Sequence, residues 1–194
     1  MRNTVVRLTS LTLKNIKNVK NGTIIMPRAD EKKFEGCKAE ILGIYGQNGS
    51  GKTAIVDALY FLQNIMTGEK LEQSILDYID TDEVNAEVNA EFKIFEDSIL
   101  YEVGYHILVS KADNVSVIER EYLNCAINKD GYRTNKNIFM DYQRTQSEVV
   151  FTPLKRLEEL VGKDKNAKMD LIVARKMAEK SNCSYIFGRD SREI

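Results

Sequence analysis

The first part of the chain alternates short apolar segments of strand length with polar connections. Residues 5–13 are rich in Val, Leu and Thr, which favours a strand, and residues 14–18 form a polar break. A second strand is predicted over residues 23–26, directly after Asn21 and Gly22, a pair that favours a tight hairpin turn. The first two strands are therefore expected to pair antiparallel.

Residues 39–45 (AEILGIY) are predicted to form a buried central strand, because this apolar run lies between a charged loop and glycines. Residues 53–68 then show helical spacing, with Gly68 placed to end the helix. The apolar positions at that spacing are Ala54, Ile55, Ala58, Leu59, Leu62, Ile65 and Met66. Val56 and Phe61 widen the apolar stripe, so the helix is expected to be covered on most sides.

Strict alternation of apolar and polar residues is clearest over residues 84–94 and repeats over residues 99–109. A third strand is predicted over residues 115–127. The links between these segments are short, which favours an antiparallel meander. Residues 132–147 are polar enough to be a loop.

The last quarter of the chain is predicted to be helical. Thr152 and Pro153 suit the start of a helix that ends at Gly162, and a second helix is predicted over about residues 165–180. Its basic residues are interpreted as a solvated face. Residues 184–187 are compatible with the start of another strand.

Composition narrows the class of protein. Hydrophobic residues make up 43% and charged residues 29%, and no apolar run reaches the length of a membrane span. The N-terminus lacks the pattern of a secretory signal, so a cytoplasmic location is expected. The net charge of −1 gives no basic footprint for nucleic acid. Cys37, Cys125 and Cys183 are interpreted as reduced thiols, and His106 as a residue on a strand face without a metal role.

One segment carries a recognisable chemical pattern, GxxxxGK[ST], between the predicted strand at residues 39–45 and the predicted helix. Its residues are Gly46, Gln47, Asn48, Gly49, Ser50, Gly51, Lys52 and Thr53. Glycines let the backbone amides approach phosphate oxygens, and the helix that follows presents unpaired N–H groups and a partial positive end. Lys52 is then expected to reach the β- and γ-phosphates of ATP, and Thr53 to offer its hydroxyl to Mg²⁺.

Hydrolysis also needs an acidic site, in which an Asp after four apolar residues holds the metal and usually a Glu beside it orients water. Residues 138–141 come nearest, but only three apolar residues precede Asp141 and the surroundings are polar. Residues 184–190 fail because Gly188 and Arg189 interrupt the run before Asp190. The catalytic acids are therefore expected to be absent from this sequence.

Taken together, residues 11–22 (LTLKNIKNVKNG), residues 43–59 (GIYGQNGSGKTAIVDAL) and the alternating strands at residues 84–127 resemble a known group. It comprises the ABC-type ATPase heads of the SMC, RecF and RecN proteins and the related RecF-like AAA-family ATPases, which include OLD-type proteins. The resemblance implies an α/β P-loop NTPase fold, here the N-terminal lobe of the head with an antiparallel β-meander. It places Lys14 and Asn15 near the edge of the ATP, and makes Gln73 the nearest candidate for the family's glutamine lid beside the metal.

The resemblance also implies a domain arrangement. Residues 1–150 would be the N-terminal lobe, and residues 151–194 the start of a helical insertion, with the sequence ending before the C-terminal lobe that holds the signature segment and the acidic site. The sequence is therefore expected to be part of a longer protein.

The function implied by the resemblance is an ATP-driven, Mg²⁺-dependent homodimer in DNA repair, chromosome maintenance or phage defence, with DNA as a candidate partner and no membrane. Three alternatives remain. The first is a nucleotide-gated module that binds DNA or protein without significant turnover, which turnover measurements would distinguish. The second is a small-molecule kinase, although the predicted meander disfavours it. The third is the ATPase subunit of a transporter, which the opening segment fits less well.

Overall fold

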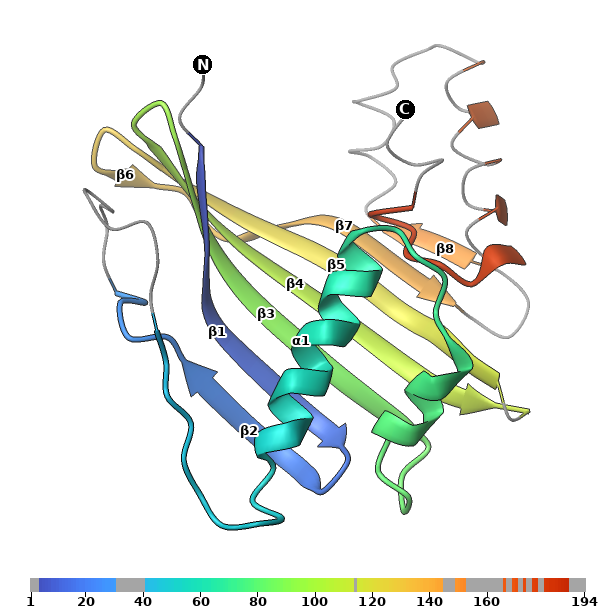
Figure 1. Cartoon of the computed structure of the whole chain (residues 1–194). Helices are drawn as coiled ribbons and strands as arrows, with labels where there is room; N and C mark the ends of the chain where they lie inside the picture. The colour runs from blue at the N-terminus through green and yellow to red at the C-terminus, as the bar shows by residue number, and fades with distance from the viewer. Residues whose placement is uncertain are drawn as a thin grey trace.

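The structure of the protein, a computed structural model, describes residues 4–30, 41–113, 115–144, 149–152 and 180–188, together with residues 166, 169, 170, 173, 176 and 177. It is dominated by one antiparallel sheet with the strand order β2-β1-β3-β4-β5-β7-β8, and β6 pairs with β5 outside this path (Figure 1). The strands are β1 (Val5–Ile16), β2 (Val19–Ile25), β3 (Asn85–Glu96), β4 (Ile99–Ala112), β5 (Val115–Lys129), β6 (Tyr132–Arg133), β7 (Asn137–Arg144) and β8 (Val149–Thr152). The helices are α1 (Lys52–Met66) and the 3-10 helix η1 (Gln73–Tyr78).

The core lies between one face of the sheet and α1, which crosses that face (Figure 1). Alternate positions of β1, β3 and β4 point toward the helix, as expected for a sheet covered on one side. Small side chains on both layers let the helix backbone approach the sheet closely. The sheet contributes Leu11, Leu13, Ala86, Val88, Ala90, Tyr105, Ile107 and Val109, and the helix contributes Ala54, Ala58, Phe61, Leu62 and Ile65.

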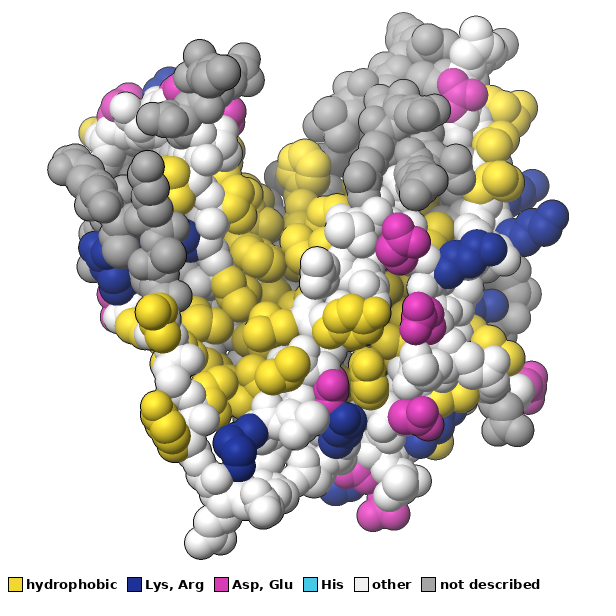
Figure 2. All heavy atoms as spheres, in the orientation of Figure 1, with side chains coloured by type: hydrophobic (Ala, Val, Ile, Leu, Met, Phe, Trp, Pro, Cys, Tyr) yellow, Lys and Arg dark blue, Asp and Glu magenta, His cyan; other side chains and the backbone are white. Residues whose placement is uncertain are grey.

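The outer side of α1 remains exposed, contrary to the expectation that the helix is covered on most sides. Val56 is 64% exposed and Tyr60 is 49% exposed, whereas Phe61 is buried. Figure 2 shows the same face of the molecule as hollowed, with apolar side chains gathered in the hollow. Among the described residues, no helix has the length and apolar character needed to cross a membrane.

The hairpin of β1 and β2 exists, but its turn differs from the predicted one. β1 continues through the supposed polar break to Ile16, and residues 17–18 make the turn. Asn21 and Gly22 lie inside β2, where they pair with Lys14 and Leu13. The turn occurs earlier because Lys17 adopts a left-handed backbone, with φ of 51°, and so supplies the conformation that the Asn-Gly pair was expected to provide.

The predicted buried strand at residues 39–45 is wrong over residues 41–45, which form no regular secondary structure and are exposed; residues 39 and 40 lie outside the described part. Ile41 is 94% exposed and Tyr45 is 95% exposed. A strand forms only where a neighbouring strand satisfies its backbone N–H and C=O groups. No strand in the described ranges pairs with this segment.

Two predictions for the second half also need correction. Residues 132–144 are not a loop throughout, because β6 and β7 form there and pair with β5, and residues 145–147 lie outside the described part. Residues 184–187 contain a turn instead of a strand. Thr152 ends β8, and the rest of the helix predicted up to Gly162 lies outside the described residues. The described residues between 166 and 181 are helical, in agreement with the second predicted helix.

Candidate phosphate-binding site

The glycine-rich segment forms an exposed loop that leads directly into α1 (Figure 1). Gly49 and Gly51 have φ values of 82° and 87°, in the left-handed region that favours glycine. The amide of Ser50 donates a 3.2 Å hydrogen bond to the carbonyl of Gln47, which closes a turn within the loop. The segment therefore forms a tight turn immediately before a helix, although no strand forms over residues 41–45 in front of it.

The N-terminus of α1 is open to an anion. Its N-cap residue is Gly51, which has no side chain to cap the helix, and the first turn contains no acidic residue. The first backbone N–H groups of a helix have no partners within the helix, and the helix dipole gives this end a partial positive charge. This end of α1 consequently has the chemistry that attracts phosphate.

Lys52 lies folded over the loop. Its ammonium donates to the carbonyl oxygens of Gly46 and Gln47 at 2.7 and 2.6 Å, and to the hydroxyl of Ser50 at 3.3 Å. The positive charge of Lys52 thus lies against the loop and contacts only neutral acceptors there. Neutral carbonyl oxygens are weaker partners for an ammonium than ionised phosphate oxygens are.

The space around each loop glycine differs. A β-carbon at Gly46 would stand 2.7 Å from the hydroxyl oxygen of Ser50, and one at Gly51 would stand 2.6 Å from Cγ2 of Val19. At Gly49 nothing lies within 4 Å, so glycine is required there for its backbone conformation alone. At Gly46, rotation of the Ser50 side chain relieves this contact, whereas at Gly51 a side chain would press against the stiff, β-branched Val19.

The remaining predicted positions lie in different surroundings. Thr53 is the second residue of α1 and is exposed, so its hydroxyl is accessible to a metal ion at the loop. Gln73 is the first residue of η1 and is exposed. Within the described ranges, no group of three or more His, Cys, Asp and Glu side chains could hold a metal ion.

Lys14 and Asn15 belong to β1. The Lys14 ammonium pairs with Glu87 on β3 at 2.7 Å, and the backbone carbonyl of Asn15, which is itself buried, accepts a 2.9 Å hydrogen bond from the amide of Asp80. Partial burial acts to raise the pKa of Glu87, but the contacts with Lys14 and His106 together outweigh it and lower this pKa below its ordinary value. Both predicted residues thus have partners in and beside the sheet.

Sequence reasoning missed the roles of Lys17 and Asn18. The side-chain amide of Asn18 donates to the carbonyl of Gly49, and Lys17 forms an ion pair with Asp57 on α1. The signal in the sequence was a Lys-Asn pair between two strand-like segments, but the nearby Asn-Gly pair is the stronger turn signal. The structure therefore brings the β1–β2 turn, residues 17–18, against the loop.

Asp141, rejected above as a metal-binding acid, is 4% exposed on β7 and forms a two-fold contact with Arg120 on β5, at 3.0 and 2.8 Å. The hydrogen bonds from Arg120 to this carboxylate raise the pKa of Arg120. Both carboxylate oxygens of Asp141 thus already accept a hydrogen bond from the Arg120 guanidinium.

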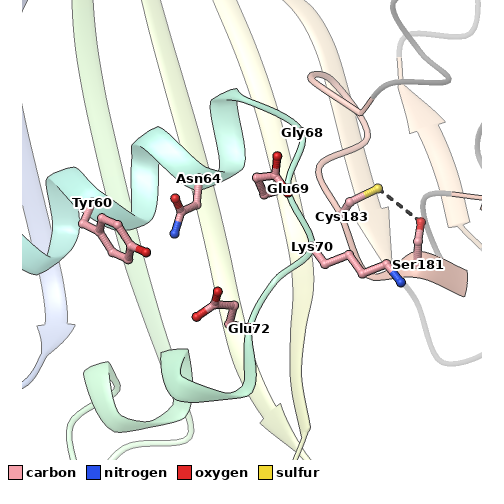
Figure 3. A pocket seen from close by; sticks show the side chains of 8 residues that line it. All are labelled: Tyr60, Asn64, Gly68, Glu69, Lys70, Glu72, Ser181 and Cys183. Atoms are coloured by element: carbon pink, nitrogen blue, oxygen red, sulfur yellow. Dashed lines mark hydrogen bonds between the residues drawn. The ribbon is translucent and has the colours of Figure 1, made fainter.

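A separate cavity of about 670 Å³ lies at the C-terminal end of α1. In Figure 3 it is bordered by Tyr60 and Asn64 of α1, by the segment that follows the helix, and by Ser181 and Cys183. A helix of this length spans about 20 Å, so the cavity and the glycine-rich loop are at opposite ends of α1. Cys183 is a free thiol, as is Cys125, and Cys37 lies outside the described residues.

Comparison with known proteins places this geometry in a family. A family model described as AAA domain matches residues 10–184, a range that contains the loop, α1 and η1. The chain is also 33% identical over 99 residues to the DNA replication and repair protein RecF of Deinococcus radiodurans. That alignment covers 51% of this chain and 24% of RecF, so the aligned part spans about a quarter of the relative's length.

Proposed function

This chain belongs to the AAA domain family of SMC/RecF-like ATPases, and on that premise we propose that residues 46–53 bind the triphosphate of ATP together with Mg²⁺. The observation that carries the proposal is the combination of an uncapped helix N-terminus with an ammonium poised over the adjacent loop. Both features supply positive charge at the same point, and the site has no acidic residue in the first turn of α1 to oppose an anion.

Binding follows from the loop's own groups. The amides at the start of α1 would hold phosphate oxygens, and the Lys52 ammonium would exchange the carbonyls of Gly46 and Gln47 for the β- and γ-phosphates. Thr53 would contribute its hydroxyl to Mg²⁺, which neutralises charge between those phosphates. In this proposal Lys14, Asn15 and Gln73 act at the margin of the nucleotide, as the family resemblance implies.

Hydrolysis requires an acid that holds the metal and a group that orients water. We propose that residues 1–150 are the N-terminal lobe of an ATPase head, that residues 151–194 begin a helical insertion, and that a further lobe of the whole protein supplies the acidic site. The exposed segment at residues 41–45 supports this arrangement, because an apolar run of strand length directly before the loop lacks a strand partner among the described residues. The whole protein would then act as an ATP-dependent homodimer in the cytoplasm, with DNA as its partner.

The antiparallel strands that follow α1 favour this class over a small-molecule kinase, in which further parallel strands would be expected. The partial match to a DNA replication and repair protein supports a role in DNA repair.

A nucleotide-gated module without turnover would use the same binding site but predicts a different result. ATP would bind stoichiometrically to the full-length protein and remain intact.

The binding proposal is tested with fluorescent ATP and ADP titrated into the protein and its Lys52→Ala variant in the presence of Mg²⁺. We expect the variant to bind ATP about 10- to 100-fold more weakly, since a charge-assisted contact is lost, and to keep the unfolding midpoint of the wild type. Lys70→Ala, beyond the other end of α1, is the matched control and should bind normally. Equal affinity of wild type and Lys52→Ala would refute the assignment.

A further inference from the structure

The turn between β1 and β2, residues 17–18, contacts the glycine-rich loop at residues 46–51 through a direct hydrogen bond. The Nδ2 of Asn18 donates to the backbone carbonyl of Gly49, a residue 31 positions away in the sequence. The amide of the next residue, Ser50, donates to Gln47 within the loop at 3.2 Å. One peptide unit of the loop is therefore held at both of its polar groups, which fixes the orientation of its plane.

A second contact joins Val19, the residue after Asn18, to Gly51, which lies two residues beyond Gly49. The side chain of Val19 packs so closely against Gly51 that a β-carbon there would stand 2.6 Å from Cγ2. Gly51 is buried and forms the N-cap of α1. Val19 thereby limits how far the helix N-terminus can move toward the sheet.

The turn itself is anchored, so it can act as a support. The Lys17 ammonium pairs with Asp57 of α1 and lies 5.3 Å from the centre of the Tyr78 ring. The Lys17 amide also donates a 2.7 Å hydrogen bond to the carbonyl of Tyr78 at the end of η1. Backbone and side chain of Lys17 thus join the turn to α1 and to the end of η1.

These contacts have a common consequence for ligand binding. A flexible glycine-rich loop must lose conformational entropy when it closes around phosphate, and this loss weakens binding. A loop that is already held in shape loses less on binding. Gly49 has no neighbouring atom within 4 Å of its β-position, so side-chain packing does not restrain it there. The hydrogen bond from Asn18 to its carbonyl therefore restrains a part of the loop that packing leaves open.

We infer that Asn18 is a positioning residue for phosphate binding, which holds the Gly49 carbonyl so that the loop is shaped before the nucleotide arrives. This inference rests on the proposed binding of ATP by residues 46–53. It assigns Asn18 no contact with the nucleotide, so its contribution should appear in the order of the empty loop as well as in affinity.

The test compares the wild type with Asn18→Ala and Asn18→Asp, using the full chain. Asn18→Asp keeps the size of the side chain but replaces the donor with an acceptor that faces the carbonyl of Gly49. Asn21→Ala is the matched control, because Asn21 is an exposed residue of the same type within β2. The measurements are fluorescent ATP affinity with Mg²⁺, and amide hydrogen exchange at residues 47–51 without nucleotide.

We expect both Asn18 variants to bind ATP about five- to tenfold more weakly, the loss of one hydrogen bond, and to exchange the loop amides faster, while Asn21→Ala matches the wild type in both. Wild-type exchange and affinity in Asn18→Ala, or in Asn18→Asp, would overturn the inference. If the wild type itself binds no ATP, the proposed function fails, and the exchange measurement on the nucleotide-free loop still decides whether Asn18 orders it.

Discussion

Glu121 on β5 accepts a 2.6 Å hydrogen bond from the phenol of Tyr105 on β4, and Glu121 has no exposed surface while Tyr105 is 1% exposed. The same carboxylate accepts hydrogen bonds from the hydroxyl of Ser184 and, at 2.8 Å, from the amide of Tyr185. A buried carboxylate with several donors connects two central strands to a segment more than 60 residues away. It is therefore expected to stabilise the packing of the turn at residues 184–187 on the sheet.

Replacing Glu121 with alanine should lower the free energy of unfolding by about 2 to 4 kcal/mol, because buried donors lose their acceptor. Tyr105→Phe removes one donor and should cost about 1 kcal/mol. Equilibrium unfolding in urea, followed by far-UV circular dichroism, measures both. A Glu121→Ala variant as stable as the wild type would show that the turn is held by other contacts.

The network also predicts a pH dependence. Burial is the main cause that raises the pKa of Glu121 above its ordinary value, although the hydrogen bonds from Ser184 and Tyr105 oppose it. Between the ordinary pKa and the raised folded one, the folded state holds the proton more tightly, so this group's contribution to stability falls as pH rises through that window. The stability advantage of the wild type over Glu121→Gln, which does not titrate, should therefore shrink as pH rises from 4 upward. An advantage that grows with pH would contradict the raised pKa.

Asp141 provides a test of which acids belong to the site. We expect Asp141→Asn to reduce the free energy of unfolding by about 1 to 2 kcal/mol, since it weakens a partly buried contact with Arg120, and to leave ATP affinity unchanged. Asp130→Asn, in the turn after β5, is the control and should be close to neutral. Titration of fluorescent ATP and unfolding in urea give the two quantities. A large loss of ATP binding in Asp141→Asn would restore this residue as a metal-site candidate.

The sequence allowed β1, β3, β4 and β5 to be predicted because one face of the sheet is covered and the other is not. That asymmetry requires apolar and polar residues to alternate along each strand. In β3, the buried Ala86, Val88 and Ala90 alternate with polar residues for this reason. The loop and α1 could be located for a similar reason, since glycine at positive φ and an apolar helical stripe are local requirements.

The contacts of the loop could not be predicted in this way. The bond between Asn18 and Gly49 depends on where the β1–β2 turn falls, and a change of turn by a few residues alters every residue that faces the loop. β7 was missed because burial does not follow polarity along it: Ile138 and Phe139 are exposed, whereas Asp141 is buried beside Arg120. Residues 41–45 show the opposite failure: an apolar run predicts a strand, but only a neighbouring strand can complete one.

Stability measurements can show whether residues 41–45 are exposed or packed as a strand. Ile41→Ser and Tyr45→Ser should each change the free energy of unfolding by less than about 0.5 kcal/mol, because both side chains are almost fully exposed. Leu11→Ala, in the buried core, should cost about 2 to 5 kcal/mol and serves as the reference. Urea unfolding of the three variants gives the comparison. A cost at Ile41 similar to that at Leu11 would mean that the segment packs as the strand that its sequence predicts.

His106 predicts a pH effect of the opposite sign. Burial is the main cause that lowers its pKa below 6.5, and the nearby carboxylate of Glu87 opposes the shift only in part. A lowered folded pKa means that the unfolded chain binds the proton first, so this contribution is present above pH 6.5 and is lost as pH falls below it. His106→Phe keeps a ring against Tyr122 and does not titrate. Between pH 7.5 and 5.5 the wild type should therefore lose more stability than His106→Phe, and equal losses would argue against a buried neutral histidine.

The two glycines with left-handed backbone in the loop separate conformational strain from steric contact. Alanine at Gly49 meets no atom within 4 Å and should cost only the backbone strain, about 1 to 2 kcal/mol, whereas alanine at Gly51 adds a contact of 2.6 Å with Val19. Gly51→Ala should therefore weaken ATP binding more than Gly49→Ala does. Shortening the opposing side chain with Val19→Ala should restore part of the binding lost in Gly51→Ala and none of that lost in Gly49→Ala. This double-mutant cycle, measured as ATP affinity, isolates the contact because the strain at Gly51 is the same with either residue at position 19. If Val19→Ala restores neither variant, Val19 does not limit the position of Gly51.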